Sequence, residues 1–146
     1  MRDTLKRSRR TKYYESKRNG FLYIAIALLS VFFLFAGSIK LTGWQKMIYE
    51  TQVNMVAQYG INPAGLKLIG LMELFGAVTI WFQDHWIAPL GALTILAASL
   101  GAIVCHYIWD TWRESVPASI TAPLSAYVAW VSREPLLAFL GVPGLI

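Results

Sequence analysis

LKLIGLMELFGAVTIWF, residues 66–82, is apolar for long enough to cross a lipid bilayer, yet it carries the carboxylate of Glu73 near its middle. An ionisable group at that depth costs at least about 2.5–3.5 kcal/mol on insertion scales, so it normally faces other helices and has a partner. The candidate partners are Lys40, at the end of the preceding apolar segment, and His106 with Asp110, near the end of the next one. The stretch therefore predicts a helical bundle that encloses Glu73.

The remaining apolar residues also come in long blocks. Hydrophobic residues make up 56% of the 146 residues, and the mean hydropathy is +0.49, which is typical of a small membrane protein. We expect an all-α fold, a membrane-embedded four-helix bundle with spans at residues 21–41, 64–82, 87–109 and 115–131.

Residues 42–62, between the first two spans, have an amphipathic pattern. One helical face is apolar and aromatic, made of Trp44, Met47, Ile48, Met55 and Tyr59. This pattern predicts a helix that lies in the membrane interface. Residues 133–146 are too few to cross again, and we expect an apolar interfacial segment there. The chain then divides into a tail (1–20), a bundle (21–132) and this last segment.

The tail is strongly basic. It holds eight of the 13 Lys and Arg residues and two of the eight acids, so it carries a net charge of +6 and the rest of the chain −1. Directly before an apolar segment, such charge marks the cytoplasmic side and attracts anionic lipid, which we favour over binding to nucleic acid. The lipid-facing candidates are Arg7, Arg9, Arg10, Lys12, Lys17 and Arg18. With four spans, both termini are expected to be cytoplasmic, in a plasma membrane or a bacterial inner membrane.

Small residues recur within the spans. They allow the backbones of neighbouring membrane helices to approach closely. The candidates for such helix packing are Gly37, Gly70, Gly76, Ala97 and Gly101. The last two have small-xxx-small spacing, so the third span is expected to pack at the centre of the bundle.

The intramembrane polar residues fall in the middle or outer half of the bundle. At the helical rise, Glu73 lies about 13 Å below the start of the second span and His106 about 5 Å below the end of the third. Lys40 lies at the outer end of the first span. One interpretation is a polar pocket for a quinone headgroup, a proton or a small polar ligand; the other is a structural ion pair between helices.

Several kinds of site are not supported by the sequence. The two histidines, His85 and His106, are 21 residues apart on one predicted helix, about 31 Å by helical rise, and cannot ligate one haem iron from opposite sides. No Cys and His cluster predicts a metal site, and the single Cys105 excludes an intrachain disulfide. We expect no cofactor other than, as an alternative, a quinone.

Three short motifs resemble the DoxX-like family of small four-helix membrane proteins. They are FFLFAGSIKLTG at 32–43, GLMELFGA at 70–77 and GAIVCH at 101–106. The resemblance covers about residues 21–132 and implies characteristic polar positions at Lys40, Glu73 and His106. Some members resemble membrane subunits of quinone-linked sulfur oxidoreductases, and others resemble assembly or chaperone proteins.

Family resemblance by itself does not fix an activity. We predict a non-catalytic accessory subunit or assembly factor of a larger membrane protein complex, because the chain is small and has an apolar carboxyl-terminal stretch. The alternatives are a quinone-binding component of an oxidoreductase, with Glu73 and His106 as quinone ligands, and a small proton-coupled transporter.

Overall fold

The computed structural model describes residues 2–142 and, within the amino-terminal helix, side chains from residue 19 onward. The described residues form α-helices and no strand, which confirms the all-α class. The helices are α1 (Arg2–Thr42), α2 (Lys46–Gln58), α3 (Pro63–Thr79), α4 (Ile87–Trp109), α5 (Val116–Val131) and α6 (Glu134–Phe139). The side chains predicted to face lipid in the tail, from Arg7 to Arg18, and residues 143–146 lie outside the described part.

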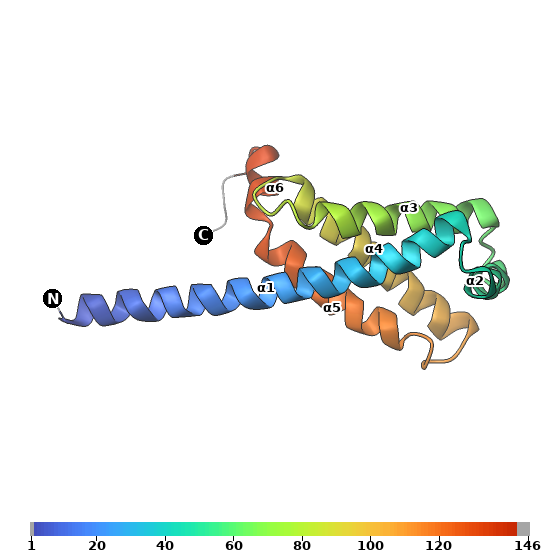
Figure 1. Cartoon of the computed structure of the whole chain (residues 1–146), viewed down its shortest axis with the longest axis horizontal. Helices are drawn as coiled ribbons and strands as arrows, with labels where there is room; N and C mark the ends of the chain where they lie inside the picture. The colour runs from blue at the N-terminus through green and yellow to red at the C-terminus, as the bar shows by residue number, and fades with distance from the viewer. Residues whose placement is uncertain (1, 143–146) are drawn as a thin grey trace.

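The basic tail and the first predicted span form one continuous helix, α1. Figure 1 shows its amino-terminal half projecting beyond the other helices. The buried residues of its second half recur every three or four positions, as one face of a helix requires: Leu22, Ala25, Ile26, Leu29 and Phe33. This face packs against the rest of the chain.

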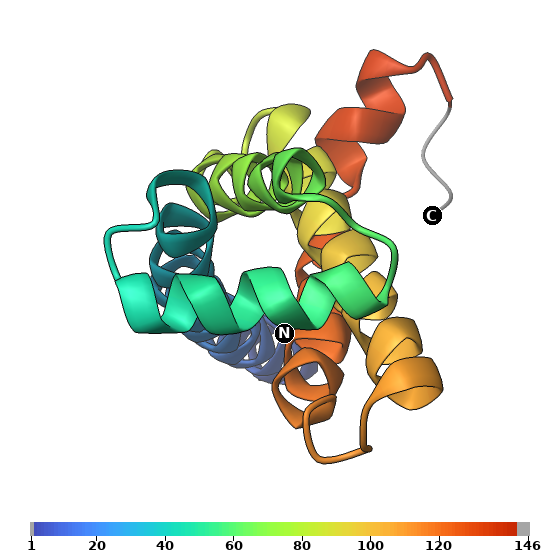
Figure 2. The same ribbon diagram turned by 90° about the vertical axis from the view of Figure 1, so that its right-hand side faces the viewer.

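Four helices share one hydrophobic core. The face of α1 meets Ala77 and Ile80 at the end of α3, Ala92 and Ile95 of α4, and Val128 of α5. α1 packs on α3, α3 on α4 and α4 on α5, while α1 also contacts α5. Viewed end-on in Figure 2, these four helices surround a common axis.

α3 is shorter than its apolar sequence suggests. Asn62 caps its start, where the side-chain oxygen accepts a hydrogen bond from the Gly65 N–H at 2.8 Å, and Pro63 occupies the first turn. The helix ends at Thr79, and a turn through residues 80–86 leads into α4. Ser30 on α1 donates to the Ala77 carbonyl at 2.8 Å and accepts from the Trp81 indole at 2.7 Å, which fastens the end of α3 to α1.

α2 lies across one end of the bundle, which we name the α2 end (Figure 2). Its axis makes an angle of 113° with that of α3. Gly43 before it and Gly60 after it have φ of +68° and +75°, a backbone region that glycine adopts readily and other L-residues rarely do. The predicted helix between spans is therefore present, and sharp turns set it across the bundle axis.

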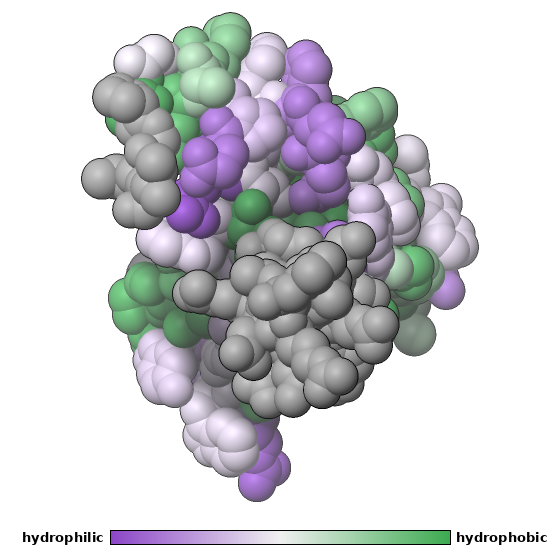
Figure 3. All heavy atoms as spheres, turned by 90° about the vertical axis from the view of Figure 1, so that its left-hand side faces the viewer, coloured by the Kyte–Doolittle hydropathy of each residue, from purple (hydrophilic) through white to green (hydrophobic). Residues whose placement is uncertain are grey.

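The opposite end, which we name the α6 end, is where α1 enters the bundle. Hydrophilic side chains gather there in Figure 3. Asp84 and His85 of the α3–α4 turn are exposed, and Arg133 forms an ion pair with Glu134 at 3.4 Å. Phe139 of α6 stacks on Trp86 with ring centroids 4.7 Å apart, so α6 packs at the start of α4.

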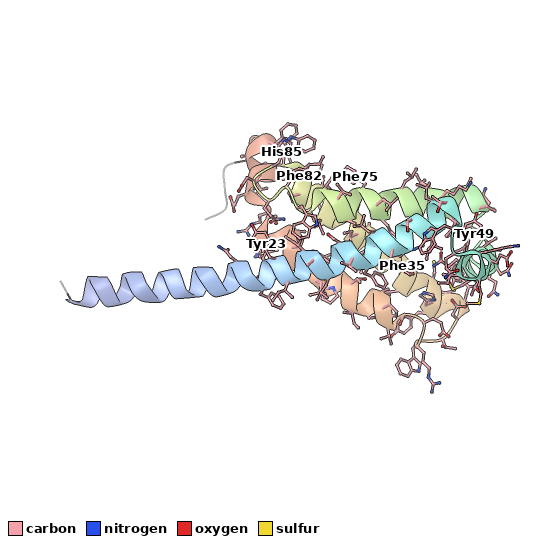
Figure 4. The ribbon with its side chains drawn as sticks, in the orientation of Figure 1. Tyr23, Phe35, Tyr49, Phe75, Phe82 and His85 are labelled. Carbon is pink, nitrogen blue, oxygen red and sulfur yellow. The ribbon has the colours of Figure 1, made fainter. Side chains whose placement is uncertain are left out.

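Within the described residues, two helical stretches are long and apolar enough to cross a membrane, Asn19–Thr42 and Ile87–Trp109. The bent pair α2 and α3 adds a third if it counts as one broken span, and α5 is shorter. Large apolar side chains lie exposed on the outer faces of the bundle; Phe35 and Phe75 in Figure 4 are examples. These features support a membrane location. Of the four predicted spans, only two form helices long enough to cross a membrane, because α3 ends at Thr79 and α5 has 16 residues.

Candidate ligand-binding site

A cavity of about 430 Å³ lies inside the α2 end of the bundle. Its walls come from α1, α3, α4 and α5. Four residues of α2 and its C-cap also line it: Gln52, Met55, Val56 and Tyr59. α1 and α5 diverge toward this end in both Figure 1 and Figure 2, and α2 crosses over the space between them. The cavity therefore owes its room to the splayed helices and its cover to α2.

Apart from Ser99 and His106, the wall from α4 consists of the small residues Ala97, Ala98, Gly101, Ala102 and Cys105. We expected Ala97 and Gly101 to bring another helix close. Instead, a Cβ added at Gly101 would have no heavy atom of a neighbour within 4 Å, and Ala97 is exposed. The small side chains of this stripe therefore leave room for the cavity instead of bringing a helix close at Gly101.

Close backbone packing occurs at the other predicted glycines. A Cβ added at Gly37 of α1 would come within 2.9 Å of the Gly70 carbonyl oxygen, and one at Gly70 within 2.9 Å of the Gly37 carbonyl oxygen. A Cβ at Gly76 would come within 2.8 Å of the Gly91 carbonyl oxygen of α4. These contacts, which leave no room for a side chain, hold α3 against both α1 and α4.

The close approach of α1 and α3 places Lys40 against Glu73. The Lys40 Nζ donates to Oε1 and Oε2 of Glu73, each at 2.7 Å. The Glu73 side chain is 6% exposed and that of Lys40 15% exposed, so the pair is largely shielded from solvent. An unpaired Glu73 carboxylate would be costly in this setting, and Lys40 neutralises it. Both residues line the cavity.

His106 forms a second polar cluster. Its Nδ1 lies 2.8 Å from Oδ2 of Asp110, one helical turn later, and 3.2 Å from the Tyr59 hydroxyl. The same hydroxyl donates to Asp110. His106 and Tyr59 line the cavity, whereas Asp110 stands behind them. No hydrogen bond joins His106 to Glu73 among the described side chains, so the predicted polar residues form two clusters rather than one.

The electrostatics of this second cluster fix its proton positions. The hydrogen bonds from Tyr59 and His106 hold the pKa of Asp110 below its usual value. Burial, followed by the hydrogen bond to Asp110, raises the pKa of Tyr59 above its usual value, so Tyr59 remains a protonated donor at neutral pH. A carboxylate only accepts, so the His106 Nδ1 that faces Asp110 carries a hydrogen and Nε2 is the ring nitrogen left over.

Sequence patterns pointed to Lys40, Glu73, His106 and Asp110 but missed Gln52 of α2 and the C-cap residue Tyr59. Tyr59 was expected at headgroup depth in the membrane interface, and Gln52 was not singled out. The spacing 52, 55, 56, 59 places these residues on one helical face, and in the structure this face covers the cavity. Met47, on the face expected to contact the membrane interface, is 74% exposed.

No curated protein and no solved structure matches this chain. A family model described as the DoxX-like family matches residues 24–132. The matched region runs from within α1 to just beyond α5 and includes the Lys40–Glu73 pair, the His106 cluster and the helices that enclose the cavity. The resemblance of the three sequence motifs is thereby confirmed, and the chain belongs to the DoxX-like family.

Proposed function

We propose that this membrane protein binds a small lipophilic molecule with a polar end group in the cavity beneath α2, and that quinones are the ligand class to test first. The observation that carries the proposal is the cavity itself. It combines a volume of about 430 Å³ with largely apolar walls and two separate polar clusters. Known small-molecule sites have volumes of about 300–1,000 Å³ and this same mixture of apolar walls with a few placed polar groups.

The polar groups suit oxygen atoms on a ring. The Lys40 ammonium has three N–H donors, and two of its contacts are to Glu73, which leaves capacity for a ligand oxygen. His106 offers Nε2, the ring nitrogen that Asp110 and Tyr59 do not engage; without a hydrogen it accepts from a ligand hydroxyl. Aliphatic and aromatic side chains, among them Phe32, Phe33 and Met72, provide the apolar surface for the body of the ligand. A headgroup with oxygens at both ends fits this arrangement.

We place α1, α3, α4 and α5 across a plasma membrane or bacterial inner membrane, with both termini in the cytoplasm and the α2 end outside. The charge of +6 on residues 1–20 supports this orientation, since basic residues flanking a span favour the cytoplasmic side. The same tail would contact anionic lipid. A ligand that partitions into the bilayer could then reach the cavity from within the membrane.

Binding can be tested with purified protein in lipid nanodiscs and a short-chain benzoquinone, in oxidised and reduced form, by equilibrium dialysis against protein-free nanodiscs. Ala102→Phe adds a ring at the cavity wall, and we expect it to weaken binding at least tenfold. Leu100→Phe, on the exposed face of α4, is the matched control and should bind as the unmodified protein does. Absence of saturable binding of either form, or equal binding by the two variants, would contradict the proposal.

A second proposal is the role of accessory subunit or assembly factor in a larger membrane complex. The observation that favours it is the exposed apolar surface after α5: Phe139 and Leu140 are 61% and 62% exposed. A mild-detergent purification should then recover a stoichiometric partner that is lost when Leu140→Ser and Val142→Ser are combined. A protein that purifies alone from its native membrane would argue against this role.

A further inference from the structure

Gln52 has a buried acceptor that nothing satisfies. It lies on the face of α2 that covers the cavity, one helical turn before Val56, which is 6% exposed. Its Oε1 is buried and has no hydrogen-bond partner among the described residues. Buried amide oxygens almost always accept a hydrogen bond, because an oxygen buried without one loses its hydrogen bonds to water and gains none in return. Because Gln52 lines the cavity, a rotation of its side chain can turn the unpaired Oε1 toward a donor in the cavity.

The carboxylates around the cavity already have donors. Both carboxylate oxygens of Glu73 accept from Lys40. Asp110, behind the cavity wall, accepts from His106 and Tyr59. Glu114 accepts from Thr111. Among the described side chains that line the cavity, Gln52 is thus the one with a buried oxygen still unpaired.

We propose that the ligand of this cavity bears a hydroxyl group and that Gln52 recognises it by accepting its O–H. This inference deepens the proposed binding function and rests on it. A phenol or alcohol with an apolar body meets the requirement, because its oxygen donates to Oε1 and can also accept from the remaining N–H of Lys40. A ketone, an ether or an oxidised quinone supplies acceptors alone and leaves Oε1 unpaired.

The position of Gln52 makes this recognition specific. α2 is held at one side by the turn at Gly43 and at the other by Tyr59, whose hydroxyl contacts His106 and Asp110. The backbone that carries Gln52 is thereby fixed over the cavity, and its side chain is directed inward on the same face as Val56. A hydrogen bond formed in a site shielded from water discriminates more strongly than one at an exposed surface.

The test uses two probes that differ only in the donor, 4-hexylphenol and its methyl ether 4-hexylanisole. Binding is measured with the full chain in nanodiscs by equilibrium dialysis, with protein-free nanodiscs subtracting partition into lipid. Two variants are compared with the unmodified protein. Gln52→Leu removes the acceptor at the cavity, and Gln58→Leu makes the same change on the exposed side of the same helix.

We expect the phenol to bind about 5- to 10-fold more tightly than the ether, as the loss of one buried hydrogen bond predicts. Gln52→Leu should abolish this preference while keeping binding of the ether, and Gln58→Leu should preserve it. Equal binding of the two probes by the unmodified protein, or an unchanged preference in Gln52→Leu, would overturn the role of Gln52 and leave the cavity as a binding site. Saturable binding of neither probe would overturn both the role of Gln52 and the proposed function.

Discussion

Lys40 and Glu73 form the ion pair that joins α1 to α3 beside the cavity. Each side chain would be a largely buried charge without the other, so the two act as a unit. The contacts at Gly37 and Gly70 bring their backbones close enough for a direct bond. The energetic consequence of the pair therefore appears when one member is removed and the other stays.

Glu73→Gln is expected to lower the free energy of unfolding by about 3 kcal/mol, because Lys40 then remains charged in a shielded site. The double variant Lys40→Met with Glu73→Gln should lose less than the sum of the two single variants. The measurement is denaturant unfolding in detergent for all four proteins of the cycle. Additive losses would show that the two side chains do not depend on each other.

At the scale of helices, glycines set the contact between α1 and α3, whereas the glycine of α4 at position 101 has no neighbour close to it. Gly37 faces the Gly70 backbone, whereas Gly101 faces open space. A change of glycine to alanine therefore meets a crowded neighbour at position 37 and open space at position 101. Comparing the stability of the two variants separates the effect of close packing from that of helix propensity.

Gly37→Ala should destabilise the protein by about 1–3 kcal/mol, since the new methyl group would overlap the Gly70 carbonyl. Gly101→Ala should be neutral or stabilising by up to about 1 kcal/mol, because alanine favours the helix and meets no neighbour. Thermal unfolding in detergent distinguishes the two. A shift of the same sign and size in both variants would refute the assigned contacts.

α2 is attached to the bundle at its carboxyl-terminal end through the hydroxyl of Tyr59. Tyr59→Phe removes the hydrogen bonds to His106 and Asp110 but keeps the ring, which packs against Trp109. We expect faster amide hydrogen exchange in α2 with little change in α4, because the cover loosens and the bundle core does not. Tyr49→Phe, on the same helix, serves as control. Unchanged exchange in α2 would mean that apolar contacts alone hold it.

For the whole molecule, the placement of the ends relative to the membrane follows from four helices that alternate in direction around one core. The α3–α4 turn lies at the α6 end with the entry of α1, and the α4–α5 loop lies at the α2 end. If α1, α3, α4 and α5 all cross the bilayer, these two connections must face opposite sides of the membrane.

Single cysteines test this arrangement after Cys105→Ser removes the native thiol. In intact cells, a membrane-impermeant maleimide should label Thr111→Cys and should label Asp84→Cys only after permeabilisation. Both positions are exposed in the structure, so lack of labelling reports the membrane and not burial. Labelling of both sites from the same side would contradict the four-span topology.

Short stretches of the sequence were enough to predict the helices, the need of Glu73 for a partner and the family. The apolar blocks predicted the helices of the bundle, since period and hydropathy are properties of a short stretch of chain. Glu73 within one such block required a partner, and the sequence reduced the candidates to Lys40, His106 and Asp110. The three motifs gave the DoxX-like family, which the match over residues 24–132 confirms. These conclusions needed no knowledge of how the helices meet.

Tertiary structure alone decided the rest. It paired Glu73 with Lys40, separated His106 into a cluster with Tyr59 and Asp110, and placed Gln52 over the cavity. It also left Ala97 and Gly101 of α4 lining the cavity, although their spacing is typical of close helix contact. The physical reason is that a cavity is a relation between helices: it arises where α1 and α5 diverge and α2 crosses them, and no single stretch of sequence encodes that relation.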